Sequence, residues 1–166
     1  MDMEAIRDFT DPGFQEAFRA YFAEIGINLK PDTDIWDEIA ASAEKEGMVC
    51  HALRREGAIT GFILFQPDEL KSRTGFFTRP VGFIRELWVR PAYRGQGLGR
   101  ALVEHAAAEL EKSGAAEIIL TYDPDAFGFY QKLGFREDPA YTAKNGQGVV
   151  ARPAAPSTFH QMENDQ

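Results

Sequence analysis

Residues 84–100 read IRELWVRPAYRGQGLGR, and this stretch decides the fold. The apolar pattern over residues 82–89 predicts a strand. Three alternating glycines, Gly95, Gly97 and Gly99, then open an amphipathic pattern that is typical of a helix. Glycines let backbone N–H groups approach a ligand closely, and the start of a helix carries a partial positive charge. The stretch therefore predicts an anion site between a strand and a helix.

The charge of this stretch is opposite in sign to that of the whole chain. The 166 residues carry 18 Lys and Arg against 26 Asp and Glu, a net charge of −8. Residues 85–100 hold one acid, Glu86, and four arginines, namely Arg85, Arg90, Arg94 and Arg100. Their local charge is +3, so the remaining residues sum to −11. The net charge argues against a broad surface for nucleic acid or an anionic membrane, whereas the local charge suits one small anion.

Two common nucleotide-binding signatures fail at this turn. Arg100 occupies the place of the last glycine in the dinucleotide fingerprint G-x-G-x-x-G, and no Gly-Lys-Ser/Thr of a P-loop follows. The pattern that remains is R-x-x-G-x-G, formed by Arg94, Gly97 and Gly99. A second distinctive stretch lies downstream, where residues 123–135 read DPDAFGFYQKLGF.

These two patterns resemble those of the acyl-CoA-dependent N-acyltransferase superfamily, usually called GNAT. In that family R-x-x-G-x-G holds the pyrophosphate of coenzyme A, and a second motif reads N-x-x-A-x-x-F-Y-x-K-x-G-F. The second motif is matched here by Ala126, Phe129, Tyr130, Lys132, Gly134 and Phe135. Asp123 stands where Asn is usual, so this position keeps a hydrogen-bond acceptor but lacks the amide donor. The resemblance covers about residues 47–138.

The resemblance implies that acetyl-CoA is the cosubstrate, and it implies which residues bind it. Backbone groups of Leu87, Trp88 and Val89 would pair with the pantetheine arm like an added strand. The pyrophosphate would lie on the glycine turn, formed by Arg94, Gly95, Gln96, Gly97, Leu98, Gly99 and Arg100. Asp123 is a further candidate contact to the pantetheine arm. For Arg94 and Arg100, a charge that only faces solvent is the alternative.

Tyr130 and Glu86 are the candidate catalytic residues. A phenol near the bound sulfur could protonate or orient the leaving thiolate of coenzyme A, whereas the alternative is a ring that packs with its hydroxyl in water. The Glu86 carboxylate could take a proton from the substrate amine or anchor that amine. A salt bridge with Arg85 or Arg90 on a solvated face is the alternative. The implied reaction is direct attack by a primary amine, without a covalent enzyme intermediate.

The whole chain predicts a mixed α/β fold. Helices and an antiparallel hairpin come first, and strand–helix–strand–helix–strand follows, which predicts a mixed sheet flanked by helices. The resemblance implies a mostly antiparallel sheet whose central strands splay apart to form the acyl-CoA cleft. Residues 67–80 are predicted to be a loop. We expect a single domain over residues 1–151 and a polar, flexible tail over residues 152–166.

Several classes of protein are disfavoured. Cys50 is the only cysteine, which excludes an intrachain disulfide, and its apolar neighbours predict a small buried side chain. The three histidines lack metal-ligand spacing, so no metal is expected. The N-terminus does not resemble a signal peptide, and no apolar run reaches the ~20 residues of a membrane span. We therefore expect a cytoplasmic protein with neither nucleic acid nor membrane as partner.

The acceptor is predicted only as a class. Residues 31–46 hold six acids, which favours a cationic amine, either a small molecule or a peptide. Trp36, Phe76 and Phe77 could line its pocket, with core packing as the default. The alternatives are a coenzyme A-binding sensor with a degenerate active site, or transfer to another acceptor or of a longer acyl chain. A homodimer also remains open.

Overall fold

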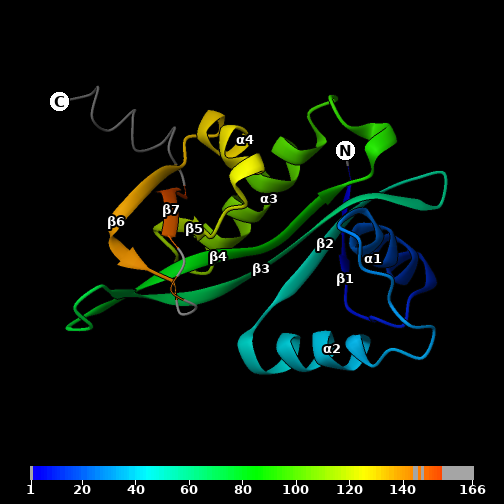
Figure 1. Cartoon of the computed structure of the whole chain (residues 1–166), viewed down its shortest axis with the longest axis horizontal. Helices are drawn as coiled ribbons and strands as arrows, with labels where there is room; N and C mark the ends of the chain where they lie inside the picture. The colour runs from blue at the N-terminus through cyan, green and yellow to red at the C-terminus, as the bar shows by residue number, and fades with distance from the viewer. Residues whose placement is uncertain (1, 144–145, 147, 155–166) are drawn as a thin grey trace. The chain divides into compact units, whose positions relative to one another are not determined.

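The computed structural model describes residues 2–143, 146 and 148–154, which form a mixed sheet with helices (Figure 1). The strand order is β1-β2-β3-β4-β5-β7-β6. β4 and β5 are parallel, whereas the pairs β1–β2, β2–β3, β5–β7 and β6–β7 are antiparallel. The predicted fold class is therefore confirmed. The elements are β1 (Met3–Ile6), α1 (Pro12–Glu24), α2 (Ile35–Glu46), β2 (Val49–Arg55), β3 (Ala58–Ser72), β4 (Thr78–Val89), α3 (Leu98–Lys112), β5 (Glu117–Leu120), α4 (Phe127–Lys132), β6 (Arg136–Thr142) and β7 (Gly148–Pro153).

Contacts divide the chain into two compact units. The first unit is Met1–Phe65 with Arg85–Val103, and the second is Gln66–Ile84 with Glu104–Gln166. The dividing line passes through β3, β4 and α3, so each unit contains part of these three elements.

The helices of the first unit begin and end at residues suited to these positions. The Asp11 carboxylate accepts a hydrogen bond from the Phe14 N–H at 2.8 Å, and Pro12 occupies the first helical position of α1. α2 ends at Gly47, whose φ of 72° is easily adopted by glycine. Both helices lie beside β1 and β2 in Figure 1.

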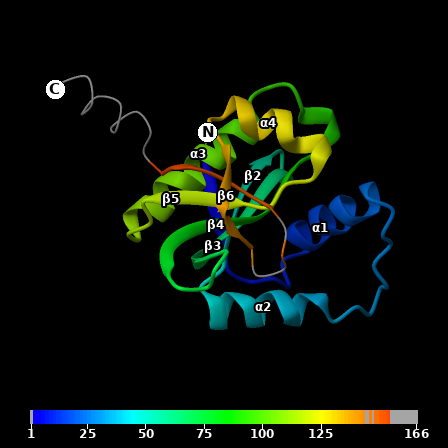
Figure 2. The same cartoon turned by 60° about the vertical axis from the view of Figure 1, so that its left-hand side comes forward.

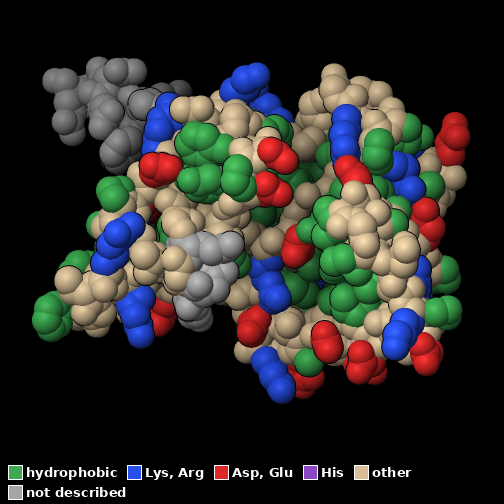
Figure 3. Space-filling model, viewed as in Figure 1, with side chains coloured by type: hydrophobic (Ala, Val, Ile, Leu, Met, Phe, Trp, Pro, Cys, Tyr) green, Lys and Arg blue, Asp and Glu red, His purple; other side chains and the backbone are tan. Residues whose placement is uncertain are grey.

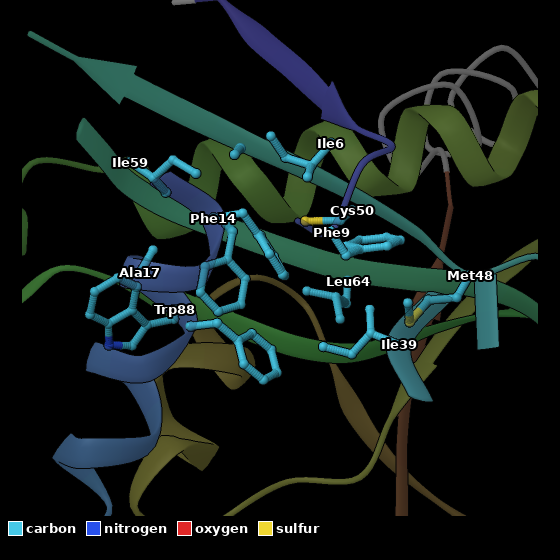
Figure 4. Packing of buried hydrophobic residues seen from close by; sticks show 13 residues of the cluster. Ile6, Phe9, Phe14, Ala17, Ile39, Met48, Cys50, Ile59, Leu64 and Trp88 are labelled. Atoms are coloured by element: carbon cyan, nitrogen blue, oxygen red, sulfur yellow. The ribbon is translucent and has the colours of Figure 1, made fainter. Parts of the chain in front are cut away.

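An aromatic core joins α1 and α2 to the strands of the first unit. Figure 4 shows side chains from α1, α2, β3 and β4 converging on one another, among them Phe14, Ile39, Leu64 and Trp88. Phe14 is fully buried and contacts the Phe62 ring with a centroid distance of 6.0 Å. Burying one such side chain contributes about 1.5–3 kcal/mol, so this cluster holds both helices in place.

The second unit contains α4, which lies beside α3 in both views (Figures 1 and 2). Gly82 of β4 permits close approach of α3, because a Cβ there would lie 2.6 Å from Leu110 Cδ1. β4 pairs with β5 at Gly82–Ile118 and Phe83–Ile119.

Two predictions about this unit need correction. Residues 67–80 are not a continuous loop, because β3 extends to Ser72 and β4 begins at Thr78. Leu70 and Ser72 are buried while Glu69 and Lys71 are exposed, an alternation too short to stand out among polar residues. The predicted tail also begins too early, since Arg152 is buried in β7. The rest of that tail, residues 155–166, lies outside the described residues.

Candidate functional site

The glycine turn leads from β4 into α3. A short 3-10 helix, Pro91–Tyr93, follows β4, and α3 begins at Leu98. Gly95 and Gly97 both have a φ of +81°, which L-residues with a side chain rarely adopt. A Cβ at either position would meet no atom within 4 Å, so the backbone conformation and not crowding requires glycine. The first N–H groups of α3 lack partners within the helix, which suits them to bind an anion.

Three of the four arginines in this stretch pair with acids from α1 and α2. Arg85 pairs with Glu46 at 3.0 Å, Arg90 with Glu16 at 2.6 Å, and Arg94 with Glu24 at 2.6 Å. Arg100 has no acidic partner among the described residues, and it is exposed on the first turn of α3. The local charge of +3 is therefore largely offset by acids that lie far away in the sequence.

Arg94 is anchored at both ends of its guanidinium group. Its Nε donates to the Val89 carbonyl at 2.9 Å, and its Nη2 donates to both Glu24 carboxylate oxygens. Within the described part of the chain these bonds leave the Nη1 hydrogens for another acceptor, and the side chain is 47% exposed. Arg94 can thus hold the turn in place and still offer donors to an anion.

The rest of the predicted turn is exposed to solvent until α3 begins at Leu98. Leu98 is buried, with 3% of its surface exposed, and it fixes the start of α3 in the core. Gln96 is exposed, and its Oε1 accepts from Arg55 Nη1 at 3.5 Å. Gly99 is half-buried at the first turn of the helix.

Glu86 is a half-buried carboxylate on β4, five residues before the start of the short 3-10 helix. It accepts a hydrogen bond from the Tyr21 hydroxyl, which α1 brings to the strand. Burial raises the pKa of the Glu86 carboxyl, while the Tyr21 hydrogen bond and the charge of Arg85 lower it less strongly. Such a carboxylate is suited to exchange a proton with a bound ligand.

Glu24 is a second carboxylate that the sequence did not single out. It ends α1 and accepts from the Trp88 indole Nε1 at 2.8 Å as well as from Arg94. The Trp88 hydrogen bond, followed by that of Arg94, holds the pKa of Glu24 below its usual range. Glu24 therefore links the end of α1 to β4 and to the glycine turn. Neither Glu24 nor Tyr21 belongs to a sequence motif, so only their place on the apolar side of a helix hinted at contact with the sheet.

The side chains of the predicted backbone-binding strand are mainly structural. Trp88 is 4% exposed and packs against Phe62 at 5.7 Å, while Leu87 and Val89 are half-buried. The Trp88 carbonyl lies 3.0 Å from where a Cβ of Gly61 would stand, so glycine permits the close approach of β3 and β4. The Val89 carbonyl already accepts from Arg94.

A pocket of about 210 Å³ adjoins Glu86 in the first unit. Its wall contains Arg85 and Glu86 of β4 and Glu38 and Ser42 of α2, and the remaining lining is apolar. Figure 3 shows acidic side chains along the edge where Figure 1 places α2. Trp36 does not line this pocket, because its ring packs into the core against Phe18 at 5.7 Å.

Tyr130 and Asp123 lie in the second unit. Tyr130 is half-buried on α4, where its ring meets the Phe135 ring edge-on at 5.6 Å. The Asp123 carboxylate accepts from the Asp125 N–H at 3.2 Å, so it caps the short 3-10 helix Pro124–Ala126. Phe76 and Phe77 are exposed between β3 and β4, which contradicts the default of core packing.

Cys50 has the environment that the sequence predicted. It is 1% exposed in the core, and burial raises the pKa of its thiol to about 12. Such a thiol is un-ionised at neutral pH and is a poor nucleophile. The described residues contain no group of three or more His, Cys, Asp or Glu side chains placed to hold a metal ion. No helix within the described ranges is long and apolar enough to cross a membrane.

The mixed sheet and the strand–glycine turn–helix unit define an α/β protein whose exposed helix start is suited to bind an anion. The model of the acetyltransferase (GNAT) family matches residues 5–135, so the chain belongs to this family. The predicted resemblance is therefore confirmed.

Two enzymes and one solved structure illustrate how similar the relatives are. A chloroplastic serotonin N-acetyltransferase 2 of Oryza sativa subsp. japonica is 36% identical over 46% of this chain and 43% of its own. A glucosamine 6-phosphate N-acetyltransferase of Trypanosoma brucei brucei is 41% identical over 59% of this chain and 66% of its own. The chain thus matches less than two thirds of the length of either enzyme. A GNAT family acetyltransferase from Brucella melitensis, solved in complex with acetyl-CoA, has the same fold with a TM-score of 0.62 and 19% identity, covering 92% of this chain and 86% of that one.

Proposed function

We propose that this protein transfers an acetyl group from acetyl-CoA to a primary amine by direct attack. The amine nitrogen attacks the thioester carbonyl carbon, a carbon–nitrogen bond forms, and the carbon–sulfur bond breaks. The nitrogen loses a proton, and the departing thiolate gains one. The names of both relatives support this class of acceptor, because serotonin and glucosamine 6-phosphate are both primary amines.

The observation that carries the proposal is the Glu86 carboxyl. Burial raises its pKa, which makes the carboxylate a stronger base for an ammonium group. It is held by Tyr21 on a strand that leads directly into the glycine turn. We assign Glu86 the role of taking the proton from the amine, directly or through water.

We assign the acetyl-CoA site to the glycine turn because of the hydrogen-bond donors that the turn presents. The N–H groups at the start of α3, Arg100 and the Nη1 group of Arg94 are the donors we propose for the pyrophosphate. The Brucella relative of the same fold, which was solved with acetyl-CoA, supports this choice of ligand. The backbone of residues 87–89 and Asp123 are proposed to contact the pantetheine arm.

Tyr130 is proposed as the general acid for the thiolate, on the strength of its motif. A covalent intermediate is disfavoured because the Cys50 thiol is buried and its pKa is raised to about 12. The proposed chemistry therefore requires two proton-transfer groups and no enzyme nucleophile.

The cosubstrate assignment is tested with a matched pair of glycine variants. Gly97 and Gly75 have φ of +81° and +75°, and a Cβ at either meets no atom within 4 Å. We expect Gly97→Asp to raise the Kd for acetyl-CoA by about tenfold or more, because the carboxylate repels the pyrophosphate. Gly75→Asp has the same backbone strain and should leave the Kd unchanged in titration calorimetry. Equal effects of the two variants would contradict the assignment.

The proposed acetyl transfer is tested by measuring thiol release from acetyl-CoA with a panel of primary amines. Glu86→Gln and Tyr130→Phe should each lower kcat by about 10²–10⁴-fold and leave the Kd for acetyl-CoA unchanged. If the wild-type protein binds acetyl-CoA but releases thiol with no amine, it is a coenzyme A-binding module and not a transferase.

A further inference from the structure

The pocket beside Glu86 has a lining that discriminates between classes of amine. Six of its wall residues are apolar and come from α1, α2, β3 and the residue just before β2, namely Phe18, Phe22, Ile35, Ile39, Met48 and Leu64. Ile39, Leu64 and Met48 lie close to one another in Figure 4. The pocket measures about 210 Å³. This is less than the ~300–1,000 Å³ of pockets for drug-sized ligands, so the occupant should be compact.

The charged groups in the wall of the pocket are mainly negative. Glu86 and Glu38 contribute carboxylates, whereas the positive charge of Arg85 is offset by its ion pair with Glu46 at 3.0 Å. Glu38 is exposed to solvent whereas Glu86 is half-buried, so a ligand in this pocket meets partly buried negative charge at Glu86 and hydrocarbon around it. One cationic or amine group on an apolar body matches this arrangement.

The same lining disfavours more polar amines. A buried hydroxyl or amide without a hydrogen-bond partner destabilises the complex, and an uncompensated charge destabilises it more. A polyamine would place its further ammonium groups against Phe18, Phe22 and Ile39, and a sugar phosphate would bring an anion toward Glu38 and Glu86.

We propose that the acceptor is a small primary amine with an apolar or aromatic body, of the arylalkylamine kind. Its nitrogen lies against the Glu86 carboxylate and its body fills the pocket between α1 and α2. This assignment rests on the proposed function, because the bound amine is the group that attacks acetyl-CoA. It narrows the acceptor from primary amines in general to one chemical class.

Arg19 stabilises the connection between α1 and α2, the two helices that contribute most of the pocket's lining. Its guanidinium group donates to the Leu29 carbonyl at 3.0 Å and to the Lys30 carbonyl at 3.2 Å, and it lies 5.5 Å from the Trp36 ring centroid. These contacts fix the connection between α1 and α2, so the pocket is present before a ligand binds.

The experiment compares phenylethylamine with spermidine and glucosamine 6-phosphate. Direct binding of each amine is measured by calorimetry, and turnover is measured by thiol release with acetyl-CoA. We expect kcat/KM for phenylethylamine to exceed both others by about tenfold or more. Tighter binding or faster turnover of spermidine or glucosamine 6-phosphate would overturn the assignment.

A variant that fills the pocket tests whether the amine binds there. Ser42→Phe should lower both the affinity and the kcat/KM for phenylethylamine by about tenfold or more, because its ring occupies the pocket. Ala40→Phe makes a similar change on the exposed side of α2 and should leave both unchanged. If the melting temperature of Ser42→Phe falls, Ser42→Leu replaces it. Equal effects of the Ser42 and Ala40 variants would show that the amine does not bind here.

The two levels of proposal fail in different ways. Without acetyl-CoA binding by the wild-type protein, the proposed function is wrong, whichever amine binds. If acetyl-CoA binds but phenylethylamine does not, in calorimetry or in turnover, the transferase proposal stands and the assignment of this pocket is wrong.

Discussion

At the scale of single residues, the structure gives Glu86 an environment that its sequence neighbours do not reveal. The alternation of apolar residues along β4 places Glu86 on the same face as Trp88, and the sequence left open whether this face is solvated. In the folded chain the carboxyl is half-buried and accepts from Tyr21, which is 65 positions away. Its raised pKa follows from burial first and is limited by this hydrogen bond.

The Tyr21 hydrogen bond predicts a shift in pH dependence. It stabilises the ionised form of Glu86, so Tyr21→Phe should raise the pKa of Glu86 further. Because the carboxylate is the active form of a base, the acid limb of kcat/KM should move to higher pH. The Glu86 pKa itself is measured by NMR titration of its carboxyl carbon.

The matched control is Tyr122→Phe. Tyr122 also bonds a glutamate, Glu137 at 3.0 Å, but this pair is exposed in the second unit. Its loss should leave both the Glu86 pKa and the acid limb unchanged. An unshifted Glu86 pKa in Tyr21→Phe would show that the hydrogen bond does not tune this carboxyl.

At the scale of elements, α1 connects the apolar core with the glycine turn. Its apolar side contributes Phe14 and Phe18 to the core, while Glu24 at its end binds Trp88 and Arg94. The sequence predicted this helix from its capping residue and its periodicity. Its polar contacts were not predictable, because residues 70 positions apart in the sequence are brought together only by the tertiary fold.

The Glu24 contacts predict that removing this side chain destabilises the protein more than breaking the ion pair of Glu16 with Arg90. Glu24→Ala should lower the free energy of unfolding by about 1–3 kcal/mol, because the buried Trp88 indole N–H loses its acceptor. Glu16→Ala breaks an exposed pair on the same helix, and Arg90 keeps its hydrogen bonds to the Ile59 carbonyl. It should cost only about 0–1 kcal/mol. Urea denaturation measures both values, and equal losses would contradict this role of Glu24.

At the scale of the whole chain, the last described strand belongs to the fold. The Arg152 side chain is 2% exposed, and it donates to both Glu104 carboxylate oxygens and to the Leu133 carbonyl. Sequence reasoning placed this residue in a polar tail because prolines follow it. An arginine with four acceptor oxygens, from Glu104, Leu133 and Pro153, and with its guanidinium group over the Phe135 ring can be buried, which composition does not indicate.

Arg152→Ala should therefore destabilise the protein by about 2–5 kcal/mol, since it removes a buried side chain and its hydrogen bonds. Arg136→Ala is the control, because Arg136 is exposed and bonds only the carbonyls of Gln131 and Phe135 among the described residues. It should cost less than about 1 kcal/mol. If both variants melt at the same temperature, Arg152 contributes no more than a surface residue.

The sequence by itself determined the fold class and the family, because these depend on local patterns. Positive φ at Gly95 and Gly97, a capped helix start at Asp11 and the apolar alternation of β4 are dictated by neighbouring residues. The second motif, over residues 123–135, is equally local.

Only the tertiary structure decided the electrostatics of the site. Local counting gave residues 85–100 a charge of +3, but α1 and α2 bring Glu16, Glu24 and Glu46 to three of the arginines. Long-range pairing also placed Tyr21 on Glu86 and formed the largely apolar pocket beside it. Charge and solvation depend on distance in space, and the chain sets these distances only when its distant segments pack together.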